Sequence, residues 1–129
     1  MITRRILLAT IAVLVSSMAH AQSVKLTATQ ITELLTGNTA IGKWEGQRYR
    51  QFFNEDGQTI FAQEGARSSV GKWRIDAEID EYQSVWPAEE SWKGWYVMEF
   101  SGRYYWVSKS TPPTPFKVEI GQQLIWPDE

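Results

Sequence analysis

The sequence predicts a mainly β protein: a small antiparallel up-and-down barrel, or a strongly curled sheet, of about eight strands with one N-terminal helix. From residue 38 to residue 124 the chain breaks into short runs rich in β-branched and aromatic residues, with turn signals about every ten residues. Only residues 26–37 have a helix pattern. Because helices do not alternate with the strands, parallel crossover folds are disfavoured. Closure into a barrel would remove exposed strand edges.

Residues 1–21 have the three parts of a secretory signal peptide: a basic head, an apolar core over residues 6–15 and a small-x-small cleavage site ending at Ala21. The core is about ten residues long, whereas a membrane-spanning helix needs roughly 20. We therefore expect a periplasmic or secreted protein without a membrane anchor, and one domain over residues 22–129.

Composition excludes several classes of function. The chain has no cysteine, and its one histidine, His20, lies in the predicted signal peptide. Catalysis by Ser-His or Cys-His pairs, zinc sites built from His or Cys, and disulfides are therefore excluded. Of 13 basic residues, Arg4 and Arg5 lie in the signal peptide, which leaves 11 against 15 acidic residues. This balance disfavours nucleic-acid binding. We expect no metal and no cofactor.

One helix opens the mature chain. Thr27 can cap its first turn while Gln30 bonds back to the cap, and Leu26 with Ile31 forms a hydrophobic staple. Gly37 ends the helix. We expect this helix to plug or cover one end of the barrel.

Eight strands follow, separated by turns. Residues 54–57 and the pair Ser101-Gly102 are expected as hairpin turns, and the proline-rich residues 111–115 as a stiff connector before the last strand. The predicted strands are residues 39–45, 47–53, 58–64, 70–77, 81–86, 94–100, 103–109 and 116–124.

Three motifs lie between about residues 26 and 107: Leu35–Thr39 ends the helix as Leu-x-Gly-Asn-Thr, Asp56-Gly57 forms a turn, and Gly71–Arg74 is a Gly-x-Trp-Arg strand. Together they resemble an uncharacterised family of small secreted bacterial β-rich proteins. The resemblance implies a secreted β-rich domain and no established activity. Many relatives carry a cysteine pair that this chain lacks.

The segment Ser101–Tyr105 contains a Ser-Gly-x-x-Tyr pattern. It is similar to the loop of the periplasmic inhibitors of animal-type lysozyme, which are also small eight-stranded barrels. In that family a serine and a tyrosine on a protruding loop enter the lysozyme cleft. The resemblance implies a hydrolase as protein partner, although a Ser-Gly turn followed by tyrosine is also ordinary hairpin sequence.

Glu89 and Glu90, between Trp86 and Trp92, form the one suggestive carboxylate cluster, because a glycosidase needs two carboxylates facing a cleft. Adjacent glutamates are more typical of a solvated loop, so we predict no enzyme activity. Trp86 and Trp92 stay candidate residues for binding a sugar-like or apolar ligand.

Arg48 and Arg50 are expected on one face of a strand, with Tyr49 on the other. Their planar guanidinium groups could bind a carboxylate or a phosphate. A solvated face with acidic neighbours is the alternative.

Aromatic content is the strongest indication of function. Seven Trp, five Tyr and five Phe are more than one small core of 108 residues hides. In the hairpin of residues 95–108 both faces are apolar, and we expect the less polar face, with Met98, to lie inside. The other face then forms an outward contact surface with Trp95, Tyr104 and Trp106, unless the helix or the C-terminal tail covers it.

These observations predict an exported, non-catalytic binding protein that uses an aromatic surface or an aromatic-lined barrel end. The expected ligand is small and apolar or sugar-like, or else a protein. The alternative is a periplasmic inhibitor of lysozyme or another hydrolase that acts through Ser101–Tyr105.

Overall fold

The computed structural model describes residues 22–127, and the predicted signal peptide lies outside the described residues. This part of the chain forms one helix and nine strands. In chain order they are β1 (Val24–Lys25), α1 (Ala28–Leu35), β2 (Asn38–Trp44), β3 (Gln47–Phe53), β4 (Gln58–Gln63), β5 (Ser69–Asp76), β6 (Glu81–Val85), β7 (Lys93–Phe100), β8 (Arg103–Val107) and β9 (Thr114–Ile120).

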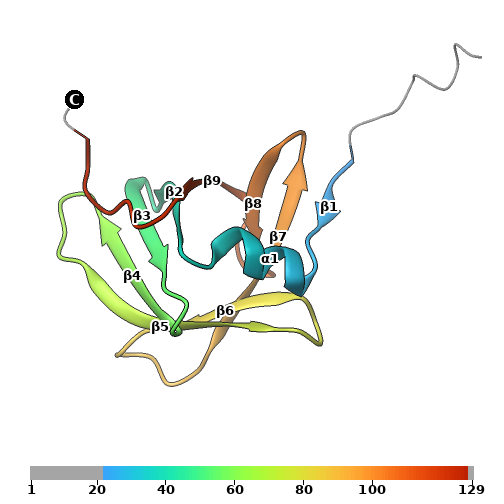
Figure 1. Ribbon diagram of the computed structural model, residues 1–129, viewed down its shortest axis with the longest axis horizontal. Helices are drawn as coiled ribbons and strands as arrows, with labels where there is room; N and C mark the ends of the chain where they lie inside the picture. Colours follow the sequence, from blue (N-terminus) through green and yellow to red (C-terminus); the bar gives the residue numbers. More distant parts are fainter. Residues whose placement is uncertain (1–21, 128–129) are drawn as a thin grey trace, which may run out of the picture.

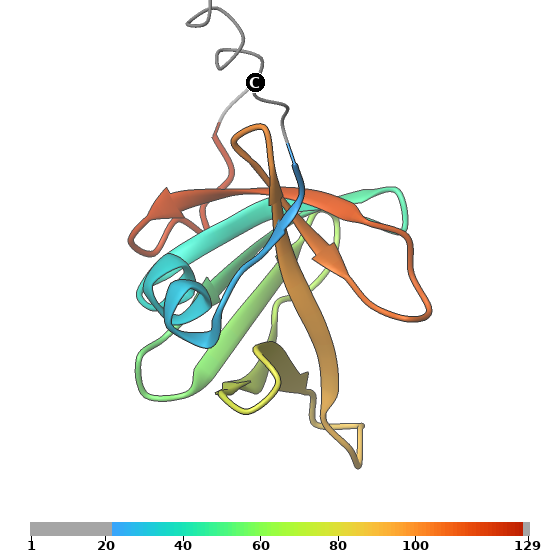
Figure 2. The same ribbon diagram turned by 90° about the vertical axis from the view of Figure 1, so that its right-hand side faces the viewer.

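Strands β2 to β9 close into an antiparallel barrel (Figures 1 and 2). Each pairs with the next along the chain, and β9 pairs with β2 to complete the ring. The predicted eight-stranded up-and-down barrel is therefore confirmed. The short strand β1 is an addition that extends the edge of β7 by pairing Val24 with Glu99 and Lys25 with Met98. Two residues are too few to give a strand pattern in the sequence.

The predicted strand ends agree with the structure within two residues, except in β9. This strand ends at Ile120 and not at residue 124, because Gly121 takes a φ of 81° and turns the chain. Gly121 N donates to the Asn38 side chain, and Thr39 Oγ1 donates to the Gly121 carbonyl. The segment after β9 therefore folds back over the outside of β2 and β3.

The capping box of α1 is confirmed. Gln30 N donates to Thr27 Oγ1 at 3.2 Å, and Thr27 N donates to Gln30 Oε1 at 2.9 Å. The helix contacts β2, β5 and β6, and its Ile31 and Leu35 are fully buried in the core. The helix thus covers one end of the barrel, which we call the closed end (Figure 1).

The hairpin of β7 and β8 has the predicted register but the opposite face inside. The two-residue turn pairs Phe100 with Arg103 and Val97 with Trp106. Val97 is fully buried and Trp106 is 8% exposed, so the predicted outward placement of Trp106 is wrong. Met98 lies on the outer face beside β1.

The physical reason for this reversal is the place of Glu99 along β7. Glu99 shares the inward face with Val97, but it pairs with Val24 near the end of the strand, where a half-buried carboxylate reaches water. One polar residue there does not decide the face. On the outer face the Lys25 side chain of β1 lies over the Tyr96 ring, with its ammonium 4.0 Å from the centre of the ring.

The core runs from α1 toward the middle of the barrel. Its fully buried members include Phe53, whose ring meets those of Trp73 and Tyr82 edge-on at 5.4 and 5.6 Å. Trp73 faces inward as its alternation with Ile75 predicts. No helix in residues 22–127 is long and apolar enough to cross a membrane.

Candidate functional site

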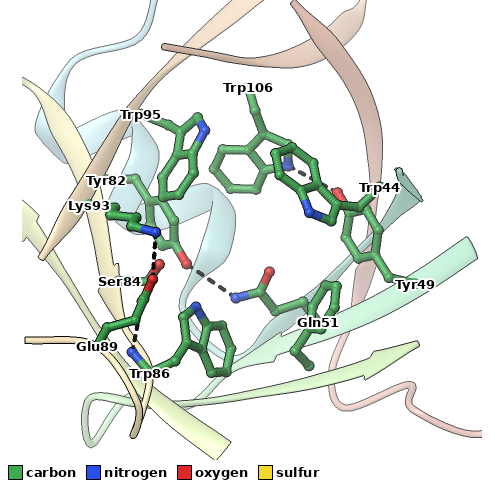
Figure 3. Close-up of a pocket in the computed structure, with 11 residues that line it drawn as sticks. Trp44, Tyr49, Gln51, Tyr82, Ser84, Trp86, Glu89, Lys93, Trp95 and Trp106 are labelled. Atoms are coloured by element: carbon green, nitrogen blue, oxygen red, sulfur yellow. Dashed lines mark hydrogen bonds and ion pairs between the residues drawn. The ribbon is translucent and has the colours of Figure 1, made fainter. Parts of the chain in front are cut away.

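The end of the barrel away from α1 holds a pocket of about 270 Å³ (Figure 3). We call it the open end; four connections surround it, namely residues 45–46, 64–68, 86–92 and 108–113. This volume is near the lower bound of roughly 300 Å³ for small-molecule sites. Eight-stranded barrels have an interior wide enough to be filled or to hold one small ligand. Here the closed end is filled and the open end keeps a cavity.

Aromatic side chains make most of the pocket wall. They come from six different strands and from the first residue of the β6–β7 loop, so only barrel closure brings them together. The aromatic lining residues are Trp44, Tyr49, Phe61, Tyr82, Trp86, Trp95 and Trp106.

Two glycines give the large rings their room. A Cβ at Gly71 of β5 would lie 2.5 Å from the Trp86 ring, so the indole rests directly on the backbone of the neighbouring strand. A Cβ at Gly42 of β2 would lie 3.0 Å from the Tyr49 hydroxyl. At both positions the absent side chain lets an aromatic ring lie flat against the wall.

Hydrogen bonds hold the inner wall rigid. The Trp106 indole donates to the Tyr49 hydroxyl at 3.0 Å, and the Gln51 amide nitrogen donates to the Tyr82 hydroxyl at 3.1 Å (Figure 3). Burial raises the pKa of Tyr49 to about 12 and raises the pKa of Tyr82 still further. Both tyrosines are therefore neutral at physiological pH and act as hydrogen-bonding groups.

The charged groups of the pocket form one ion pair at its rim. Lys93 Nζ lies 2.6 Å from Glu89 Oε2, and Glu89 Oε1 accepts a hydrogen bond from the backbone nitrogen of Trp86 at 3.2 Å. The Lys93 ammonium, followed by the Trp86 amide, lowers the pKa of the Glu89 carboxyl. The pair thus fixes the start of the loop that carries Trp86, and it is electrically neutral.

Of the candidate site residues, Trp86, Trp95 and Trp106 meet in this pocket. They belong to its inner wall, so the predicted outward placement of Trp95 and Trp106 is wrong. Tyr104 lies nearer the core, with its ring 5.9 Å from that of Phe116.

The other tryptophan of the β6–β7 loop lies outside the pocket. The Trp92 ring lies under the Arg74 guanidinium, 3.9 Å from it, on the outer face of the barrel. Trp86 and Trp92 therefore have different environments although they are only six positions apart in the chain. Glu90 is exposed and does not join Glu89 in a cleft.

Arg48 and Arg50 face outward on β3, with Tyr49 inward, as predicted. Arg48 pairs with Glu64, while Arg50 donates to Glu119 at 3.2 Å and to the Gln123 carbonyl at 2.9 Å. Both guanidinium groups contact the ring of Trp126, at 5.1 and 5.2 Å. The two arginines thus bind the C-terminal segment of the chain itself and do not reach the pocket.

Ser101 lies at the tip of the β7–β8 hairpin, far from the pocket along both strands. Ser101 and Gly102 have φ of 51° and 79°, the two positive values of a type I′ turn, and both are exposed. Figure 2 shows this tip projecting beyond the barrel. Tyr105, the other residue of the predicted loop, is half-buried on β8.

Sequence reasoning missed most of the pocket, since of its lining residues only Trp86, Trp95 and Trp106 were among the candidate site residues. Trp44, Phe61 and Gln51 were not singled out, because each looks like an ordinary strand residue. The signal that could have found them is their inward phase: Tyr49 and Gln51 alternate with the outward arginines on β3.

No group of three or more His, Cys, Asp or Glu side chains within residues 22–127 could hold a metal ion. Comparison with family models, with curated proteins and with solved structures finds no match.

Proposed function

We propose that this protein is a non-catalytic binding protein whose site is the pocket at the open end of the barrel. The observation that carries this proposal is a space left unfilled among large side chains: seven aromatic residues surround a cavity of about 270 Å³. A small core gains stability by filling such a space, since each cavity in a core is destabilising. Aromatic walls kept apart by rigid hydrogen bonds are typical of a preformed ligand site.

Binding of the fluorescent apolar amine N-phenyl-1-naphthylamine tests this proposal. We expect its emission to rise on mixing with the protein, and Trp86→Ala to weaken binding at least about tenfold by removing one wall. Trp92→Ala is the matched control, because Trp92 comes from the same loop but lies outside the pocket. Absence of binding to the native protein, or equal losses in both variants, would overturn the proposal.

Export is part of the proposal. The signal-peptide pattern supports it, and the intact mass of protein recovered from outside the cytoplasm tests it. The expected mature chain starts at Gln22, and a product that keeps its first residues would contradict this.

Inhibition of a hydrolase is the second candidate function. The projecting type I′ turn with exposed Ser101 favours it. The test is lysis of cell-wall substrate by animal-type lysozyme with and without the protein. We expect Ser101→Ala to relieve any inhibition and Trp86→Ala to leave it unchanged, because these residues lie at different places on the barrel.

A further inference from the structure

Gln51 is the one amide side chain in the wall of the pocket, and its orientation follows from its partners. Thr59 Oγ1 donates its hydrogen to the Phe52 carbonyl at 2.9 Å. It can therefore only accept from Gln51, and the Gln51 group that lies 2.9 Å from it must be the NH₂. The Gln51 amide nitrogen also donates to the Tyr82 hydroxyl, so both amide hydrogens are used.

This network directs the Gln51 amide oxygen into the cavity. Figure 3 shows the oxygen pointing into the space between the rings, away from the amide nitrogen that donates to Tyr82. It makes no hydrogen bond within residues 22–127 and is not a buried unpaired atom, so it is accessible from the pocket. The pocket thus offers a fixed hydrogen-bond acceptor among aromatic walls.

Two donors accompany this acceptor. The indole nitrogens of Trp44 and Trp86 are turned toward the same space in Figure 3. Neither makes a hydrogen bond in the described part of the chain, and neither is a buried unpaired atom. The pocket can therefore accept one hydrogen bond from a ligand and donate others to it.

The charged groups of the pocket indicate whether its ligand carries a charge. Glu89 and Lys93 neutralise each other at the rim, and the pocket contains no other charged side chain among the described residues. An ion entering the cavity would lose water without meeting an opposite charge, which is costly. The walls therefore favour an uncharged ligand.

The small number of polar groups in the pocket favours a flat ring over a sugar. A sugar carries hydroxyl groups around its whole ring, and each buried hydroxyl needs a partner. This pocket has few polar groups and many ring faces. Resting on the proposed binding function, we propose that the site takes a small, flat, uncharged ring compound whose N–H or O–H donates to Gln51 Oε1.

Calorimetric titration of the mature protein with four probes of similar size tests this proposal. Indole is a flat donor, benzofuran has the same shape without the donor, 1-methylquinolinium is a flat cation, and 2-naphthoate is a flat anion. We expect indole to bind at least about tenfold more tightly than each of the other three, because an unpaired acceptor or a desolvated charge weakens binding. Equal binding of benzofuran, or tighter binding of either ion, would overturn the proposal.

Variants of glutamine sharpen the test. Gln51→Leu should reduce the affinity for indole to that for benzofuran, whereas Gln83→Leu, on the outer face of β6, should keep the preference. Circular dichroism checks that both variants fold. If Gln51→Leu does not fold, the four-probe comparison on the native protein decides whether the proposed ligand class is right. Binding of N-phenyl-1-naphthylamine without a preference for indole would leave the binding function standing and reject this ligand class. Failure of every probe would reject both.

Discussion

At the closed end of the barrel Ile31, Leu35 and Phe53 have no exposed surface, whereas at the open end Trp44, Phe61 and Trp86 are half-buried around a cavity of about 270 Å³. Both ends are built from the same eight strands and use large apolar side chains. They differ in what covers them, because α1 fills one end and only short connections surround the other. The two ends therefore differ in role: the closed end stabilises the fold, and the open end holds the proposed ligand site.

The largest expected effect is at the closed end. Phe53→Ala should lower the free energy of unfolding by about 3–5 kcal/mol, because it leaves a cavity among Trp73, Tyr82 and Trp106. Trp86→Ala should cost much less, since its ring is half-buried. Urea unfolding of both variants measures the difference, and equal losses would remove the distinction between the two ends.

Trp106 and Met98 test which face of the β7–β8 hairpin is inside. Trp106→Ala should cost about 3 kcal/mol or more, because the buried ring stacks on Phe116 at 4.2 Å and its indole bonds to Tyr49. Met98→Ala on the outer face should cost about 1 kcal/mol. Thermal melts of the two variants decide it; a larger loss for Met98→Ala would contradict the inward face described above.

Alkaline pH should destabilise the barrel, because it ionises the buried side chains of Tyr49 and Tyr82. Burial holds the pKa of Tyr49 at about 12, above its unfolded value of roughly 10. The neutral form is thus favoured by folding, and its stabilising contribution is complete below pH ~10 and is lost as the pH rises toward 12. Tyr82 changes in the same direction.

We therefore expect stability to fall above pH ~10, with tyrosinate absorbance from the buried rings appearing together with unfolding. In Tyr49→Phe this pH dependence should be weaker. Ionisation of all five tyrosines without any loss of structure would contradict the role of the buried pair.

The smallest expected effect is at the start of α1. Thr27→Ala should cost about 1 kcal/mol, because it removes the acceptor for Gln30 N. Thr29→Ala is the matched control, because Thr29 is an exposed threonine in the first turn of the same helix. Chemical denaturation measures both, and an equal small change in the two would show that the capping box adds nothing.

Much of the fold could be predicted because its signals are local. The capping box from Thr27 to Gln30 lies within four residues, and the Ser101-Gly102 turn sets the hairpin register by itself. Strand ends follow from glycine and proline positions. The end of β9 at Ile120 was missed because a turn at Gly121 depends on Asn38 and Thr39, which are more than 80 residues away in the chain.

The candidate site was predicted only in part. Trp86, Trp95 and Trp106 were named, but Trp95 and Trp106 were expected on an outward surface, and Trp44, Phe61 and Gln51 were missed. Trp86 and Trp92 look alike in sequence, yet one rests on Gly71 inside the barrel and the other under Arg74 outside it. Trp86 can lie inside the barrel because residue 71, in another strand, is a glycine and leaves room for the ring.

The sequence by itself determined that residues 38–120 form a meander of antiparallel strands, since strand alternation, turns and the helix cap act between near neighbours. Only the tertiary structure decided which face of the β7–β8 hairpin is inside. Alternation divides a strand into two faces without choosing between them, and in β7 both faces are apolar. Barrel closure makes the choice, because Val97 and Trp106 must share their side with Phe53, Tyr82 and Phe116, and the same closure brings the pocket residues together.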